Sequence, residues 1–484
     1  MGAVGLSFGS PTSGQGFDVT STVNQIVTNL QAVETPWKNQ LTTLQSQDTA
    51  LTSLGTQLST LTTDLQNLTD FDGVMSDKTG SSSDTNVLEL TSASSTAEAG
   101  THTVTVQNLA QTSSAASDAV GASDVLTGGI TFKVGTGDWQ TVNVGDGSTA
   151  ATLSGLAMAI NNDPDAGVTA SVLTNADGTQ RLSLVSQTGG TAGEITIANS
   201  TNNAQSPTTL ADSTNPDSNT GLGLATIQDG VDAHFTVDGV SLSSGTNTVA
   251  NAIPGVTFQL LSTGTSSSSS PGSTPESVEV VIANDTSSIE TAVNTFVTDY
   301  NTVIKAIDAQ EGKDSSGNPE PLYGSSVLAQ LQEGLQSAVS QSFGTGTINS
   351  LISLGITASS SDDGTLTLDS STLDDALNSN FNQVVSLFQD AGSFGSTFSQ
   401  TLESLGNDSG SDGAISLALS EDSSQETTLN TDISNQEALI TTQKTNLTAE
   451  LNAANQVLQS IPEQIQEINE MYSAITGYDN SQNG

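Results

Sequence analysis

The sequence predicts an α+β multidomain fold with a nested architecture: terminal antiparallel coiled-coil helices, a mixed helical domain, and inserted all-β domains. Three observations lead to this prediction. Apolar residues recur every seven positions near both ends of the chain, short alternating runs fill the middle, and helical spacing returns after Asn284. A sustained heptad repeat is typical of a coiled-coil seam, and alternation of apolar and polar residues is typical of a strand.

The first heptad region lies near the N-terminus. We expect Asp18 or Thr20 to cap a helix that starts near Val19. Pro36 should kink or divide this helix, because proline lacks an N–H and clashes with the preceding turn. The pattern stops near Leu68. Two rows of apolar residues form its seam. The first row is Leu30, Trp37, Leu44, Leu51, Leu58 and Leu65, and the second is Ile26, Val33, Leu54, Leu61 and Leu68.

The second heptad region lies near the C-terminus and suggests a register for pairing. Polar gaps interrupt the N-terminal seam at Gln40 and Gln47, and the C-terminal seam at Gln436 and Gln443. Buried amides are costly when unpaired, so we expect Gln40 to face Gln443 and Gln47 to face Gln436 in an antiparallel pair. The first apolar row of the C-terminal seam is Ile433, Ile440, Leu447, Ala454, Ile461, Ile468 and Ile475, and the second row is Leu451, Leu458, Ile465 and Tyr472.

The order of elements predicts layers that the chain leaves and re-enters. Strand-like runs occupy the middle, with one helical insert at 153–160, and Asp-Gly pairs such as Asp238-Gly239 suit tight turns. A flexible loop is expected over 266–274. The expected domains are a coiled-coil leg (1–40 and 441–484), a helix-rich domain with a small β element (41–112 and 283–440), an inner β domain (113–128 and 228–282) and an outer β domain (129–227).

Composition excludes several classes of protein. The chain has 52 Asp and Glu against 7 Lys and Arg, a formal charge of -45, so its surface repels phosphate and we expect no nucleic-acid partner. No apolar run is long enough to span a bilayer, so no membrane insertion is expected. The N-terminus lacks the basic region and apolar core of a cleavable secretory signal, so we do not expect one there. The absence of cysteine is compatible with export of an unfolded chain through a narrow channel.

The residue types needed for catalysis are sparse. The two histidines, His102 and His234, lie in strand patterns, and no nucleophile elbow, phosphate loop or zinc-binding helix motif occurs. The run 161–165 has part of a calcium-loop pattern, but a turn after the short helix explains it more simply. We therefore expect no enzyme activity, no cofactor and no metal site.

The heptads allow two interpretations. They can build a helix bundle within one chain, or a seam that also packs against other chains. Both apolar rows continue over several turns with few flanking charges. This favours contact with other subunits, because exposed apolar stripes usually mark interaction sites.

Several motifs resemble the family of flagellar hook-associated protein 2, the filament cap proteins. The opening run 14–27 resembles the start of the family, and 92–110 resembles its early strand pair. The run 129–186 is similar to the flagellin IN motif of several filament proteins. Runs similar to the C-terminal region of the family are AHFTVDG (233–239), IPGVT (253–257), FVTDYN (296–301), LGI (354–356), DGTLTLD (363–369) and VVSLF (384–388). Phe17 departs from a leucine that the family often has there.

The resemblance implies an extracellular cap at the growing tip of a bacterial flagellum, exported by the flagellar type III system. Such a cap would form a ring-like homo-oligomer, contact flagellin and the hook–filament junction protein, and promote folding and polymerisation of exported flagellin. An export chaperone is expected at the C-terminal helix. The expected contact helices carry Val23, Ile26, Leu30, Ile461, Ile465, Ile468 and Tyr472.

Two alternatives remain open at the level of sequence. One is another flagellar axial component, a hook–filament junction protein or a flagellin. The hairpin around Asp363-Gly364, followed by the run from Phe381 to Phe388, argues against it, because we expect that combination only in caps. The other is a surface adhesin or glycan-binding role in cell adhesion for the β domains, testable on the fragment 113–282.

Overall fold

The chain divides into a helical unit (residues 1–69 and 290–484) and a β unit (residues 70–289). The computed structural model describes residues 16–145, 147, 149–199, 202–203, 208–212, 222–264, 276–360, 363–406 and 413–476. The loop expected over 266–274 lies outside these residues. The helical content at both ends and the sheets in the middle confirm the predicted α+β multidomain class.

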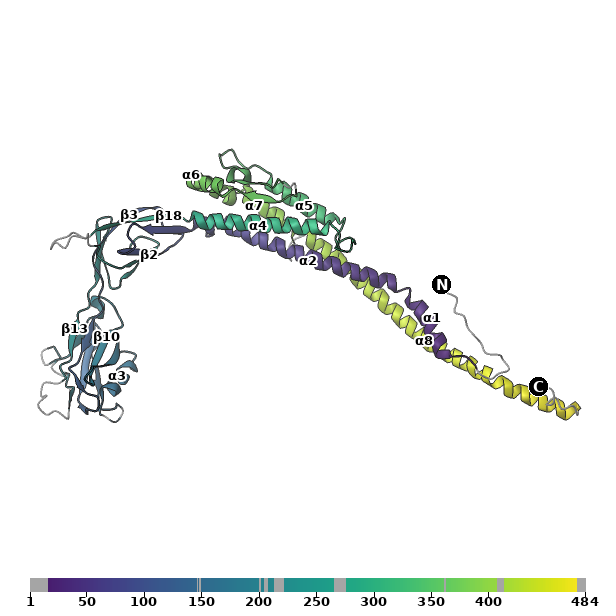
Figure 1. Cartoon of the computed structure of the whole chain (residues 1–484), viewed down its shortest axis with the longest axis horizontal. Helices are drawn as coiled ribbons and strands as arrows, with labels where there is room; N and C mark the ends of the chain where they lie inside the picture. Colours follow the sequence, from purple (N-terminus) through teal and green to yellow (C-terminus); the bar gives the residue numbers. More distant parts are fainter. Residues whose placement is uncertain are drawn as a thin grey trace. The chain divides into compact units, whose positions relative to one another are not determined.

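Helices of the two chain ends build the helical unit, and Figure 1 shows α1 and α2 running along α8. A small hairpin, β19 with β20, interrupts the helices as expected. The elements are α1 (Val19–Gln31), α2 (Thr35–Thr69), α4 (Thr286–Gln310), α5 (Ser326–Val339), η3 (Leu351–Leu354), β19 (Ile356–Ala358), β20 (Leu366–Leu368), α6 (Ser370–Gln389), α7 (Phe394–Leu405) and α8 (Ala414–Thr476).

Local sequence signals set the ends of the N-terminal helices. The side chain of Asp18 accepts a hydrogen bond from the Ser21 backbone N–H at 3.1 Å and so caps α1. The predicted division at Pro36 is confirmed: α1 ends at Gln31 and α2 begins at Thr35, so Pro36 lies in the first turn of α2, where a missing N–H costs nothing.

The core of the helical unit combines a leucine stripe with an aromatic cluster. Leu58 and Leu61 of α2 are at most 1% exposed. The ring of Phe394, at the start of α7, lies 6.0 Å from that of Phe296 in α4 and 5.8 Å from that of Phe388 in α6, both edge to face. Such contacts add to the gain from burial and fix how the helices pack.

The β unit contains two hydrophobic cores. One is built around Phe235 and Phe258 and the other around Phe132 and Leu184. The first core carries the sheets β1-β18-β3-β14-β15 and β16-β17-β2, and the second carries β13-β4-β10-β5 with β9 beside β10, β11-β7-β8, and β12-β6.

The helical insert expected over 153–160 is confirmed as α3 in the β unit. In the two-residue turn between β14 and β15, Asp238 has φ +51 and Gly239 φ +81, which confirms the expected tight turn. The bounds are η1 (Val74–Ser76), β1 (Lys78–Ser82), β2 (Leu88–Ala93), β3 (Gly100–Asn108), β4 (Ser114–Ala116), β5 (Val120–Gly121), β6 (Leu126–Thr127), β7 (Gly129–Val134), β8 (Gln140–Asn143), α3 (Leu153–Asn161), β9 (Val168–Thr174), β10 (Thr179–Ser186), η2 (Thr191–Gly193), β11 (Ile195–Ile197), β12 (Ala211–Asp212), β13 (Ala225–Gln228), β14 (Ala233–Val237), β15 (Val240–Ser244), β16 (Thr248–Ala250), β17 (Val256–Leu260) and β18 (Ser277–Asn284).

The borders between domains differ from the expected ones. The helical unit stops at Thr69 and resumes at Glu290, whereas the sequence suggested 112 and 283. Strand β3 pairs with β14 and β18, and β2 pairs with β17, so both belong with the first core. Strand β4 pairs with β10 and β13, which places 114–116 with the second core rather than with the first. Pairing between strands that lie far apart in the sequence determines these borders.

Candidate functional site

The two chain ends pair through a small apolar core. Val19, Val23 and Val27 of α1 are buried together with Ile440 of α8. Half-buried residues pack around this core: Phe17, Leu30, Leu447 and Leu451. At the start of α1, the backbone N–H of Phe17 donates to Oδ1 of Asn455 at 2.9 Å. The end of the described N-terminal segment is therefore fixed beside position 455 of α8.

The register of this pair differs from the predicted one. Nζ of Lys38 lies 3.0 Å from a carboxylate oxygen of Glu437 and 2.8 Å from one of Glu34. With Lys38 beside Glu437 in an antiparallel pair, Gln40 lies beside Asn435, about two helical turns from Gln443.

The expected pairing of the glutamines is wrong, because the side-chain amides of Gln40 and Gln47 both have other environments. The side chain of Gln40 is exposed to solvent. Nε2 of Gln47 donates to the backbone carbonyl of Pro321 at 3.0 Å, so this amide is satisfied without Gln436. Neither amide needs a partner on α8, and the pairing energy that motivated the prediction is absent.

Beyond Asn455, α8 continues past the start of α1 (Figure 1) and carries an apolar stripe. We call this the terminal stripe; its residues are Ile461, Ile465, Ile468, Tyr472 and Ile475. Spacings of four and three place them on one face of the helix. Their exposure is unusual for such side chains, at 63% for Ile468, 56% for Tyr472 and 79% for Ile475.

The opposite face of the same segment is polar. Glu463 and Glu470 lie half a turn away from the terminal stripe, and Nε2 of Gln466 donates to the carboxylate of Glu470 at 3.1 Å. Pro462, inside α8, cannot donate a backbone hydrogen bond to the preceding turn. This end of α8 is therefore amphipathic, and its apolar side is exposed from Ile465 to Ile475.

The residues predicted to make contacts with other proteins fall into two groups. Val23 is 2% exposed inside the α1–α8 pair, and Ile26 and Leu30 are half-buried. Ile465, Ile468 and Tyr472 are exposed, while Ile461 is half-buried. Met471, on the flank of the stripe, is 60% exposed but is not among the predicted contact residues. Its place beside Tyr472 falls outside a strict heptad, so the repeat gave no signal for it.

Close acid pairs join α2 to its neighbours. The carboxyls of Asp64 on α2 and Asp299 on α4 are in hydrogen-bonding contact, and burial followed by this contact raises the pKa of Asp64 to about 6. Burial and the charge of Asp48 on α2 likewise raise the pKa of Asp422 on α8 to about 6. Two ionised carboxylates have no hydrogen to share, so each contact favours one bound proton.

Other residues that stood out in the sequence have structural roles. Nδ1 of His102 lies 2.7 Å from a carboxylate oxygen of Asp238 at the β14–β15 turn. Oδ1 of Asp163 accepts from the backbone N–H of Asp165 at 3.0 Å, which is a turn contact. Among the described residues, no cluster of three or more His, Asp or Glu could hold a metal ion. No described helix is long and apolar enough to cross a bilayer.

Comparison with known proteins gives the family. A family model for the C-terminus of flagellar hook-associated protein 2 matches residues 230–473, and a model for its N-terminus matches residues 15–113. The chain belongs to the flagellar hook-associated protein 2 family. The second hydrophobic core of the β unit, from Ala115 to Leu222, lies between the two matched regions.

Relatives and a solved structure agree with membership of the hook-associated protein 2 family. The B-type flagellar hook-associated protein 2 of Pseudomonas aeruginosa strain PAO1 is 29% identical over 324 residues, which cover 64% of this chain and 66% of that protein. The protein of Escherichia coli K12 is 26% identical over 378 residues, covering 75% and 76%. The chain thus spans slightly less than two thirds of the Pseudomonas relative.

The fold is also similar to that of the D1-D2-D3 domains of the flagellar cap protein FliD from Escherichia coli. That structure has a TM-score of 0.55 and 24% identity, and the match covers 77% of this chain and 99% of the other. The adhesin role of the β domains stays a prediction.

Proposed function

We propose that the protein is a filament cap at the tip of a bacterial flagellum, where it promotes folding and polymerisation of exported flagellin. Family membership supports this role. The observation that carries the proposal is the exposed terminal stripe at the end of α8. Burying a large aliphatic side chain contributes about 1.5–3 kcal/mol, so several such residues on one helix face favour contact with another apolar helix.

The proposed mechanism needs no bond chemistry, so the protein is not an enzyme in this account. A ring-like homo-oligomer would hold several legs against the filament end, and flagellin would fold in the confined space beneath it. Each leg would use the terminal stripe to pack against helices of flagellin or of the hook–filament junction protein. Confinement favours assembly because it shields apolar helices that would otherwise aggregate.

The protein must be exported before it can act as a cap. The proposed location is extracellular, at the tip of the flagellum, and the proposed route is the flagellar type III system. A cysteine-free chain can pass such a channel unfolded without the hazard of wrong disulfides. During export the terminal stripe needs cover, and an export chaperone on the C-terminal helix would provide it.

Substitution on the terminal stripe tests the proposal. Ile468→Glu places a charge in the middle of the stripe, while Glu470→Gln on the opposite face is a matched control. In a cap-null strain, the control should restore filaments, and Ile468→Glu should be secreted but leave flagellin as monomers in the medium. Normal filaments with Ile468→Glu would overturn the role of the stripe.

A further inference from the structure

The terminal stripe continues the face of α8 that α1 covers. On this face, Ile440 is buried against the valines of α1. Ile468 and Ile475 follow Ile440 at 28 and 35 positions, both multiples of seven, so they lie on the same side of a helix with a heptad repeat. Because α1 begins at Val19, it covers only the first part of this face, and the stripe is exposed from Ile465 to Ile475.

The chain enters α1 from the side of the terminal stripe. Helix α1 runs antiparallel to α8, and the backbone N–H of Phe17 donates to Oδ1 of Asn455 at 2.9 Å (Figure 1). One residue earlier, a Cβ atom on Gly16 would lie 3.2 Å from Nε2 of Gln459, one turn further along α8. The chain direction at Gly16 therefore points along α8 toward the terminal stripe.

Residues 1–15 lie outside the described part of the chain, but their sequence suits the terminal stripe. The run 1–17 contains no Asp, Glu, Lys or Arg, although the whole chain has a net charge of -45. Its large apolar residues Val4, Leu6 and Phe8 alternate with small ones. An uncharged segment of this kind can bury apolar side chains on the stripe without repulsion from the acids on the other side of α8.

The length of chain before α1 is sufficient to reach the stripe. Phe8 precedes Phe17 by nine residues and Val4 precedes it by thirteen, so an extended chain spans about 30 Å and about 43 Å, respectively. On α8, Ile475 follows Asn455 by 20 residues, a distance of about 30 Å along the helix. The apolar side chains at 4–8 can therefore reach the exposed end of α8 from the fixed point at Phe17.

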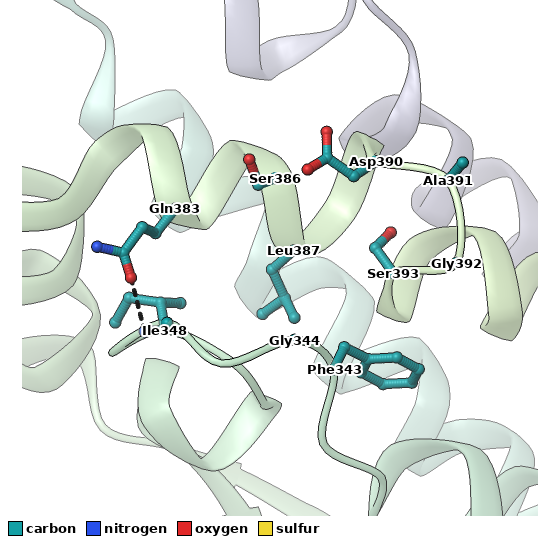
Figure 2. Close-up of a pocket in the computed structure, with 11 residues that line it drawn as sticks. Phe343, Gly344, Ile348, Gln383, Ser386, Leu387, Asp390, Ala391, Gly392 and Ser393 are labelled. Atoms are coloured by element: carbon teal, nitrogen blue, oxygen red, sulfur yellow. Dashed lines mark hydrogen bonds between the residues drawn. The ribbon is translucent and has the colours of Figure 1, made fainter.

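The cavity where α6 turns into α7 suits these side chains less well. Its volume is about 240 Å³, and Figure 2 shows the polar side chains of Gln383 and Asp390 around it beside Leu387 and Phe343. Oε1 of Gln383 accepts from the backbone N–H of Ile348 at 3.1 Å. Apolar side chains in this cavity would displace water from polar groups, which is unfavourable. The terminal stripe offers an apolar face instead.

We propose that residues 4–8 bind the terminal stripe in the free protein and cover it until a filament helix displaces them. A segment tethered beside its site has an effective concentration of about 1 mM, so in dilute solution it occupies the stripe before a second copy of the chain does. The contact is an autoinhibitory cover that shields an apolar surface before assembly. This regulatory meaning rests on the proposed use of the stripe in capping.

A disulfide engineered into the cysteine-free chain tests the contact. Ser7→Cys lies between Leu6 and Phe8 and keeps the apolar side chains. The second cysteine replaces Met471 on the flank of the stripe or, as a matched control one position away, Glu470 on the opposite face. In full-length protein at low micromolar concentration without flagellin, the disulfide within one chain should form at least about threefold faster with Met471→Cys. Non-reducing gels of samples quenched over time measure both rates.

An anchor variant and a mixing experiment complete the test. Leu6→Ser with Phe8→Ser, added to the Ser7→Cys/Met471→Cys protein, should lower the rate to that of the Glu470→Cys control. Equal rates with Met471→Cys and Glu470→Cys, or an unchanged rate in the anchor variant, would overturn the proposal. Disulfides formed as fast between copies in a mixture of the two single-cysteine proteins would also overturn it, since a second copy would then be the occupant. Flagellin is absent, so failure here is distinguishable from failure of the filament assay above.

Discussion

Replacing Asp64 by asparagine should strengthen the contact between α2 and α4 at neutral pH. Asp64 touches Asp299, and its pKa of about 6 lies above its ordinary value of 3.8. For an acid with a raised pKa, the related stability is complete below the ordinary pKa and is lost as pH rises through the raised one. The wild-type contact is therefore protonated and favourable at pH 4, and electrostatically costly above pH 6.

The size of the effect follows from the shift. A rise of about two pKa units corresponds to about 3 kcal/mol. Asp64 is only half-buried, so solvent screening reduces the expected cost at pH 7.5 to about 1 kcal/mol. In Asp64→Asn, the amide N–H donates to Asp299 at every pH and replaces the shared proton. The gain should thus be about 1 kcal/mol at pH 7.5 and vanish near pH 4.

Hydrogen–deuterium exchange of peptides from α2 is the appropriate assay, since a protein of two units does not unfold in a single step. After correction for intrinsic exchange rates, opening of α2 should be about fivefold rarer in Asp64→Asn than in the wild type at pH 7.5. Asp374→Asn, an exposed acid on α6, should change nothing. Equal exchange in Asp64→Asn and wild type at pH 7.5, or the same difference at both pH values, would refute the reasoning.

Three further predictions concern the core and the leg. Leu61→Ala should lower the unfolding free energy of the helical unit by about 2–5 kcal/mol, because Leu61 is fully buried. Leu439 is half exposed, so Leu439→Ala should lower it by less than about 1 kcal/mol, and equal losses in denaturation curves of the two variants would contradict the assigned burial. Phe394→Ala should cost about 3–5 kcal/mol because it removes the centre of the aromatic cluster, and an unchanged unfolding midpoint would argue against that packing. Deletion of residues 1–40 should leave a folded, secreted protein that cannot cap, and filament growth in a cap-null strain would rule out the leg role.

Sequence could predict the elements because their signals are local. The heptads identified α2 and the end of α8, Asp18 marked the start of α1, and the positive φ of Asp238 and Gly239 followed from an Asp-Gly pair. A helix stripe or a two-residue turn depends on neighbours within a few positions, which the sequence displays directly.

The register and the domain borders could not be predicted in the same way. Gln47 is satisfied by the carbonyl of Pro321, a backbone group that has no sequence signature. Strand β3 has the alternation of any half-buried strand, and only its pairing with β14 and β18 assigns it to the β unit. The missing capping hydrogen bond of Ser393 at the start of α7 could not be predicted either, because serine is a favoured N-cap residue.

The most direct test of the central claim is photo-crosslinking from the terminal stripe in growing flagella. A photoreactive phenylalanine analogue at Ile468 should form covalent adducts with flagellin or the junction protein, and the same analogue at Glu470 on the opposite face should form few. Equal yields from both positions, or no adduct with either protein from Ile468 in flagella that elongate normally, would contradict the account.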